Sequence, residues 1–175
     1  MSELTAGRNV KGRVSKFTKD YAIVVAILLL MVVFTFASDY FLTYRNIRNI
    51  FIQTVSVAIV CIGQAMIVTT GEFDLSLGQN VCLTSAVMAY LIKFAGFNPW
   101  IAIICAILVG AMVGMSNGLL IAYAGIPCFI VTLGFQMIAK GAAKIITNAS
   151  PIAGMPDQIK WIGRGFIGGN EYGIP

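Results

Sequence analysis

A short polar stretch between two apolar segments carries the most distinctive chemistry of this sequence. It reads Gly71-Glu72-Phe73-Asp74-Leu75-Ser76-Leu77-Gly78 and places two carboxylates and a hydroxyl between segments that are each long enough to enter a bilayer. Acidic groups and glycines are unfavourable in that setting. The stretch therefore indicates either a functional site or a break in a membrane helix.

The residues around Ser76 predict the start of a helix near Leu77. Ser76 and Gln79 have the spacing of a capping box, in which the hydroxyl and the glutamine side chain each bond to a backbone amide. Asp74 would meet the positive end of the helix dipole and free amides, so it can remain ionised without a basic neighbour in sequence. A plain capping carboxylate and a functional group both fit Asp74, and Glu72 fits either a solvated or a paired position.

An integral membrane enzyme is the competing interpretation, with Glu72 and Asp74 as an acid and a base. However, the sequence has no histidine, and its four cysteines form no Cys-x-x-Cys pair, so they indicate small packing residues rather than a metal site. The phosphate-binding pattern Gly-x-x-x-x-Gly-Lys-Ser/Thr is also absent. We therefore predict no catalytic residue, no metal and no cofactor in this chain.

Composition predicts an integral membrane protein. Of 175 residues, 58% are hydrophobic and only 11% are charged, whereas about a quarter of the residues of a soluble domain are charged. About five apolar blocks approach the length needed to cross a bilayer, although the first is short and the third fits a re-entrant segment as well. The expected fold is an all-α, polytopic bundle of transmembrane helices; the blocks are 21–37, 50–70, 75–92, 100–124 and 129–146.

Charge predicts the orientation of the first block. Residues 1–20 hold five of the twelve basic residues and are expected to form a cytoplasmic tail. A signal peptide has a similar pattern, but Phe36-Ala37-Ser38-Asp39 makes a poor cleavage site, which favours an uncleaved anchor. With five crossings, the Asp74 turn faces the cytoplasm and 147–175 forms an extracytoplasmic loop that leads to a further helix. The inner loops contain no Lys or Arg, so this rule orients only the first helix.

The formal net charge of +5 does not indicate nucleic-acid binding. The basic residues of the chain cluster beside apolar blocks, where they meet the anionic headgroups of membrane lipid.

Glycines and polar residues within the blocks predict how the helices pack. Gly110, Gly114 and Gly118 form two overlapping Gly-x-x-x-Gly units, so we expect a strip against which a neighbouring helix of the same chain packs closely. Several polar residues lie within otherwise apolar blocks and are expected to bond between helices or to line an aqueous path. These candidates for the path are Gln64, Asn80, Thr84, Asn117, Thr132 and Gln136, together with Asp74 and Ser76 at the break.

The order of several motifs resembles the permease subunits of bacterial ABC importers for ribose, galactose, xylose and similar sugars. One departure is that Glu72 and Phe73 stand where the family usually has a glycine, which adds charge and bulk to the turn. The matching residues are Phe41-Leu42-Thr43, Asn46, Asn49-Ile50, Ala58-Ile59, Ile62-Gly63-Gln64, Asp74-Leu75-Ser76-Leu77-Gly78, Asn117-Gly118, Ile126-Pro127, Phe129-Ile130, Thr132-Leu133-Gly134, Gly141 and Pro151-Ile152.

The resemblance implies a transport subunit of the bacterial cytoplasmic (inner) membrane. Permeases of this family are longer, so the chain corresponds to an N-terminal half, with 21–146 as its membrane domain. The implied partners are an ABC ATPase that binds ATP, a periplasmic or extracellular sugar-binding protein and a second permease subunit. Import of another small solute, such as an autoinducer or a nucleoside, and a small structural membrane protein without transport activity remain alternatives.

Overall fold

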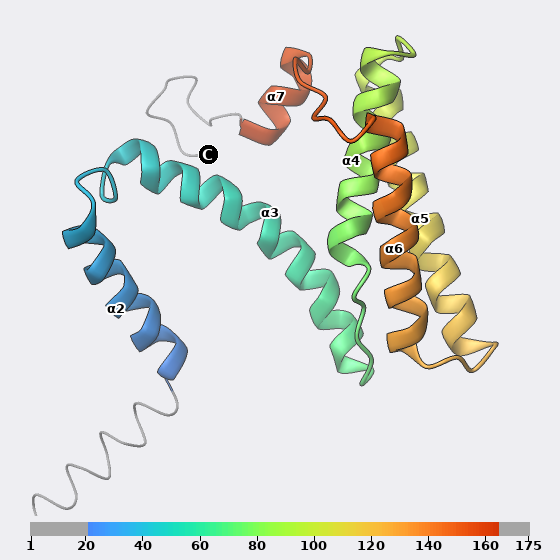
Figure 1. Cartoon of the computed structure of the whole chain (residues 1–175), viewed down its shortest axis with the longest axis horizontal. Coiled ribbons are helices and arrows are strands. Elements are labelled where there is room, and N and C mark those ends of the chain that lie inside the picture. The colour runs from blue at the N-terminus through green and yellow to red at the C-terminus, as the bar shows by residue number, and fades with distance from the viewer. Residues whose placement is uncertain (1–20, 165–175) are drawn as a thin grey trace, which may run out of the picture. The chain divides into compact units, whose positions relative to one another are not determined.

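The computed structural model describes residues 21–164 of the chain, and within this range every regular element is a helix. The expected tail 1–20 and the final part of the expected loop, 165–175, lie outside the described residues. The chain divides into two compact units, Met1–Ile50 and Phe51–Pro175, each of which is described by itself. The helices are α2 (Ala22–Ala37), α3 (Tyr44–Thr69), α4 (Leu77–Lys93), α5 (Pro99–Ala122), α6 (Cys128–Thr147) and α7 (Asp157–Arg164) (Figure 1).

The all-helical fold predicted from the apolar blocks is confirmed for the described residues. Among them, α3, α5 and α6 are long and apolar enough to cross a membrane. α2 is apolar but has 16 residues, or about 24 Å, which is less than the bilayer core. α4 has 17 residues and is more polar. The segment 147–175, predicted as a loop, contains the short helix α7.

In the first unit, a compact turn joins α2 to the start of α3. The Asn46 side chain donates from Nδ2 to the Phe41 carbonyl at 2.8 Å, and the Thr43 hydroxyl donates to the Tyr40 carbonyl at 2.7 Å. The rings of Phe34 and Phe41 are 5.6 Å apart. These contacts give Phe41, Thr43 and Asn46 a structural role in the turn.

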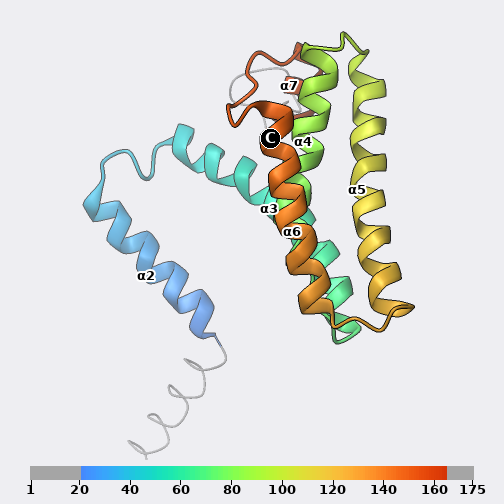
Figure 2. The same ribbon diagram turned by 45° about the vertical axis from the view of Figure 1, so that its right-hand side comes forward.

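In the second unit, α4 packs along both α5 and α6, while α5 and α6 contact each other less extensively (Figures 1 and 2). The buried core between α4 and α6 consists of Leu83, Ala86, Ala139 and Ala143. Three of these four residues are alanines, which let the helix backbones approach closely, as is typical of helix pairs in membranes. The more polar helix α4 thus occupies the most extensively packed position of this bundle.

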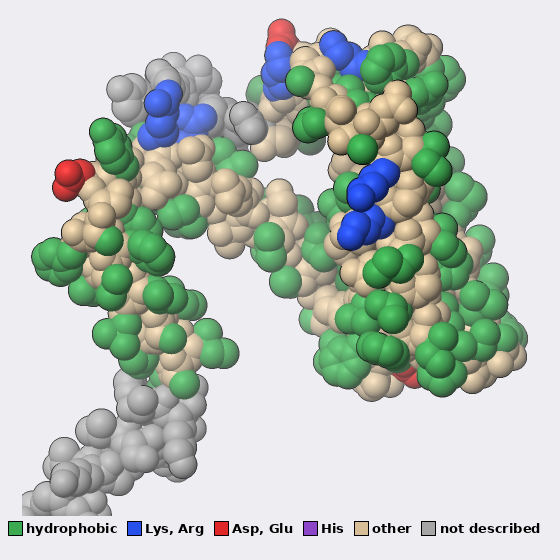
Figure 3. Space-filling view, viewed as in Figure 1, with side chains coloured by type: hydrophobic (Ala, Val, Ile, Leu, Met, Phe, Trp, Pro, Cys, Tyr) green, Lys and Arg blue, Asp and Glu red, His purple; other side chains and the backbone are tan. Residues whose placement is uncertain are grey.

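The outward surface of the second unit is apolar. Space-filling shows hydrophobic side chains over the bundle (Figure 3), among them the exposed residues Ile107, Leu108 and Ile138. Such a surface suits contact with lipid tails. Lys140 and Lys144 are exposed on α6, and the second lies in its last turn. Their long side chains can reach the headgroup region, as expected for snorkelling residues.

The three glycines of α5 have different surroundings. A Cβ at Gly110 would stand 3.1 Å from Cγ2 of Thr84, and the Gly110 carbonyl accepts a hydrogen bond from Asn80 Nδ2 at 3.3 Å. At Gly114 and Gly118, a Cβ would have no neighbour within 4 Å. Among the described residues, α4 therefore contacts the predicted packing strip at Gly110, and Gly114 and Gly118 have no close neighbour.

We expect Gly110→Leu to destabilise the chain more than Gly114→Leu. A side chain at Gly110 would push α4 away from α5, and overpacking of this kind costs about 1 to 3 kcal/mol. The measurement is thermal aggregation of the two purified variants in the same detergent. Equal melting of both variants would show that α4 and α5 do not approach closely at Gly110.

Candidate functional site

The connection between α3 and α4 begins with a glycine in a left-handed conformation. Gly71 has a φ of +83°, and its N–H donates to the Val68 carbonyl at 3.0 Å. The hydroxyl of Thr70 donates to the Ile67 carbonyl at 2.6 Å. These bonds satisfy carbonyls at the end of α3, where the helix no longer supplies partners. Residues 72–75 then form a non-helical segment before α4 begins at Leu77.

Asp74 organises this segment through two short hydrogen bonds to one residue. Its Oδ1 accepts the backbone N–H of Ser76 at 2.7 Å and the Ser76 hydroxyl at 2.6 Å. The carboxylate thus binds an amide at the start of α4, near the positive end of the helix dipole. This geometry agrees with the prediction that Asp74 meets free amides at a helix start.

The predicted capping box at Ser76 and Gln79 is wrong, although the predicted helix start at Leu77 is confirmed. Ser76 has φ −81° and ψ −18°, a helical conformation, and its side chain makes no capping bond. The reason is that the hydroxyl donates to the Asp74 carboxylate, a stronger acceptor than a neutral group.

A buried amide connects this segment to α5. Asn117 donates from Nδ2 to the Ser76 hydroxyl oxygen at 2.9 Å, across 41 positions of sequence. Ser76 is 1% exposed and Asn117 is 4% exposed, so water does not compete for this bond. The result is a chain of hydrogen bonds from Asn117 through Ser76 to Asp74, which we call the Asp74 network. The Oδ1 atom of Asn117 is buried and has no hydrogen-bond partner.

A cavity of about 320 Å³ lies beside the Asp74 network. Its wall includes Glu72, Asp74, Asn117 and Thr132, and Gly118 contributes a position without a side chain. The Thr132 hydroxyl is buried and donates to the Cys128 carbonyl at 2.8 Å. The acidic side chains of the wall, Glu72 and Asp74, are acceptors of hydrogen bonds. Such a wall is suited to a ligand that donates hydrogen bonds, such as a hydroxyl group or water.

The cavity wall contains no basic side chain. The sequence has no Lys or Arg between Arg48 and Lys93 or between Lys93 and Lys140, the stretches from which the wall residues come.

The other predicted path residues lie outside this cavity. Asn80 bonds from α4 to the α5 backbone at Gly110, and its Oδ1 is buried without a partner. Gln64 on α3 also has a buried oxygen without a partner, and Gln136 is half-buried on α6. The structure thus joins Asp74, Ser76 and Asn117 in one network and brings Thr132 to the same cavity. Asn80 adds a second polar contact between α4 and α5.

Two cavity residues were not singled out from the sequence. Thr70 and Cys128 both line the wall, but a threonine at a helix end and a cysteine beside a proline have no distinctive pattern. Among residues 21–164, no group of three or more His, Cys, Asp and Glu side chains is arranged to hold a metal ion.

Comparison with known proteins identifies the family. Residues 46–168 match the family described as the permease component of the branched-chain amino acid transport system. This match covers more than half of the chain, so the chain belongs to that permease family. It is an integral membrane protein, with three described helices that are long and apolar enough to cross a membrane.

Three known permeases illustrate the similarity. The ribose import permease protein RbsC of Escherichia coli is 31% identical over 173 residues, which cover 96% of this chain and 53% of that protein. The galactose/methyl galactoside import permease protein MglC of Escherichia coli is 32% identical, with 86% and 49% covered. The xylose transport system permease protein XylH of Haemophilus influenzae is 31% identical, with 84% and 40% covered.

The chain spans about half the length of these relatives or less. No solved structure matches it.

We expect Ser76→Ala to destabilise the chain by about 1 to 3 kcal/mol, because it leaves the buried Asn117 amide without an acceptor. The matched control is Ser85→Ala within α4, where the exposed hydroxyl bonds to the Val81 carbonyl of the same helix. The measurement is the free energy of unfolding, or the melting temperature in a fixed detergent. Equal effects of the two substitutions would show that the Asp74 network contributes nothing to stability.

Proposed function

We propose that the chain forms the N-terminal part of a permease subunit in a binding-protein-dependent ABC importer for monosaccharides. The observation that carries the proposal is the similarity to permeases for ribose, galactose and xylose along 84% to 96% of the chain. The location that follows is the bacterial cytoplasmic (inner) membrane. Import of another small solute, such as an autoinducer or a nucleoside, would use the same architecture.

In this proposal, the chain contributes positioning and polarity but no covalent chemistry. The Asp74 network holds a non-helical segment between α3 and α4 against α5, and the cavity next to it offers acceptors to a solute that carries hydroxyl groups. Broken helices at membrane depth are tolerated where the irregular backbone is enclosed by protein or lines a cavity. The Asp74 segment has this arrangement.

The remaining polar residues supply further contacts along the bundle. Asn80, Gln64 and Gln136 provide amide groups on α4, α3 and α6, of which Asn80 and Gln64 have a free buried oxygen. An unpaired buried oxygen is unfavourable, and these two side chains would have to turn toward the path before water or a solute hydroxyl could reach them.

The proposal requires other chains. ATP would be bound by an ABC ATPase, the solute would be delivered by a periplasmic or extracellular sugar-binding protein, and a second permease subunit would complete the pathway. A complete importer would pass between states that differ in the contacts between its subunits. A part of the permease cannot form all of these contacts alone.

The decisive experiment is ATP-dependent uptake of labelled ribose, xylose and galactose into proteoliposomes. We expect uptake when the chain is combined with the C-terminal part of a matching permease, the ATPase and the binding protein. We expect none when either the chain or the C-terminal part is omitted. Robust uptake with this chain as the only permease component would contradict its assignment as a part, and failure of every tested sugar in the complete system would contradict the substrate class.

A second expectation concerns the charge of Asp74. In the completed system, Asp74→Asn should lower uptake several-fold more than it lowers the amount of protein in the membrane. The reason is that the neutral amide weakens the interaction with the start of α4, which is worth about 0.3 to 2 kcal/mol. Asp39→Asn is the control, because Asp39 is exposed in the turn after α2. Wild-type uptake by Asp74→Asn at equal protein amount would leave Asp74 as an ordinary capping residue.

A further inference from the structure

The short helix α7 is amphipathic. Lys160 donates from Nζ to Oδ1 of Asp157 at 2.8 Å, and both side chains are exposed. This hydrogen bond and the positive charge of Lys160 lower the pKa of Asp157. Elsewhere around the helix, Trp161 is 70% exposed and Ile162 is 53% exposed. Asp157 and Trp161 are four positions apart and share a face of the helix, whereas Ile162 lies on the side opposite the Asp157–Lys160 pair.

The segment before α7 places this helix at one end of the bundle. α6 ends with Asn148 and Ala149 at φ values of 50° and 53°, and the Ala149 N–H donates to the Lys144 carbonyl at 2.8 Å. The chain turns there, and Ile152 and Met155 then line a hollow with residues of α4. Because this segment packs along α4, the end of the bundle at which α7 lies is fixed (Figure 1).

A second contact supports this placement. The Lys93 ammonium at the end of α4 approaches Gly154, where a Cβ would stand 3.0 Å from Nζ. The Pro156 carbonyl then accepts the N–H groups of Ile159 and Lys160 at 3.1 Å each, which begins α7.

Exposed aromatic residues gather at the same end of the bundle. Tyr90 and Phe94 at the end of α4 have ring centroids 5.4 Å apart, and Phe97 and Trp100 follow at the start of α5; all four are exposed. Aromatic residues concentrate where a membrane meets water, because their rings combine an apolar body with a polar edge or tip. These residues, which we call the aromatic belt, therefore indicate the depth of the headgroup layer on this side.

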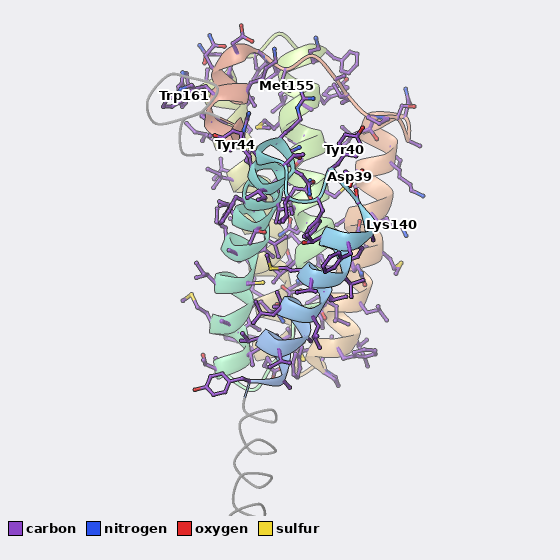
Figure 4. All side chains as sticks on the ribbon, turned by 90° about the vertical axis from the view of Figure 1, so that its left-hand side faces the viewer. Asp39, Tyr40, Tyr44, Lys140, Met155 and Trp161 are labelled. Carbon is purple, nitrogen blue, oxygen red and sulfur yellow. The ribbon has the colours of Figure 1, made fainter. Side chains whose placement is uncertain are left out.

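We propose that α7 lies in the headgroup layer of the membrane beside the aromatic belt, with Ile162 against lipid, the Asp157–Lys160 pair toward water and Trp161 (Figure 4) at the boundary between them. Lipid is the occupant that the observations favour, because Trp161 and Ile162 are exposed at the end of the bundle where the aromatic belt lies. An amphipathic helix with an exposed tryptophan and a charged side binds membranes in this way. This inference does not depend on which solute the importer carries.

The chain has two tryptophans, so Trp100→Phe leaves Trp161 as a specific fluorescent reporter. The purified chain with this substitution is placed in vesicles of phosphatidylcholine and phosphatidylglycerol. The acyl chains carry bromine either near the headgroup or near the bilayer centre. We expect stronger quenching by the shallow bromine than by the deep one, and weak quenching by iodide in the water. Trp161→Phe, which leaves Trp100 in the aromatic belt, provides the reference for shallow quenching.

Two substitutions on different sides of α7 test the orientation. Ile162→Asp should reduce the shallow quenching of Trp161 at least twofold, whereas Lys160→Gln should leave it unchanged. Quenching of Trp161 by iodide but not by lipid would show that α7 stands in water. Protection from both quenchers would show that protein covers this side. Either result would overturn the proposal.

Discussion

The structure depends on how one interruption between membrane helices satisfies its polar groups. Where α3 ends and α4 begins, the chain leaves the helical conformation for residues 72–75, and the backbone groups at the two helix ends lose their partners within the helices. The Asp74 carboxylate accepts both the amide and the hydroxyl of Ser76, and Asn117 donates to the same hydroxyl from α5. A polar segment that would be unfavourable alone thus becomes a fixed connection between three helices.

The close packing of α4 and α5 follows from the same arrangement. Asn117 holds the start of α4 against α5, and further along the pair Asn80 bonds to the backbone at Gly110, where the absence of a side chain permits the approach. On the other side of the Asp74 network, Gly118 has no neighbour to contact and contributes to the cavity wall. The glycine repeat of α5 therefore serves two purposes, close contact at one position and open space at another.

Much of this fold is predictable from sequence because long apolar blocks have few alternatives to helices in a bilayer. The polar residues Asp74 and Asn117 were also identifiable, because buried polar groups in such blocks require a partner or a function. The bond from Asn117 to Ser76, through which Asn117 is connected to Asp74, was not identifiable, since these two residues are 41 positions apart. The capping box at Ser76 failed because its pattern considers only residues 76 and 79, whereas the Asp74 carboxylate accepts the Ser76 hydroxyl.

The glycine strip and α7 show two further limits of the sequence pattern. The Gly-x-x-x-Gly repeat indicates a surface that a helix can approach, but not how far along α5 the contact with α4 extends. α7 has eight residues, which is too short for apolar periodicity to stand out within a segment predicted as a loop. Its position depends on the packing of Ile152 and Met155 along α4, a tertiary contact without a local signal.

The central claim is that Ser76 and Asn117 act as one unit, and a double-mutant cycle tests it most directly. The free energy of unfolding in a fixed detergent is compared for the wild type, Ser76→Ala, Asn117→Ala and the double variant. The account predicts that the double variant loses less stability than the sum of the two single variants, with a coupling energy of about 0.5 to 3 kcal/mol. Additive losses would contradict the account, because they would show that the bond between α4 and α5 does not hold the interrupted segment in place.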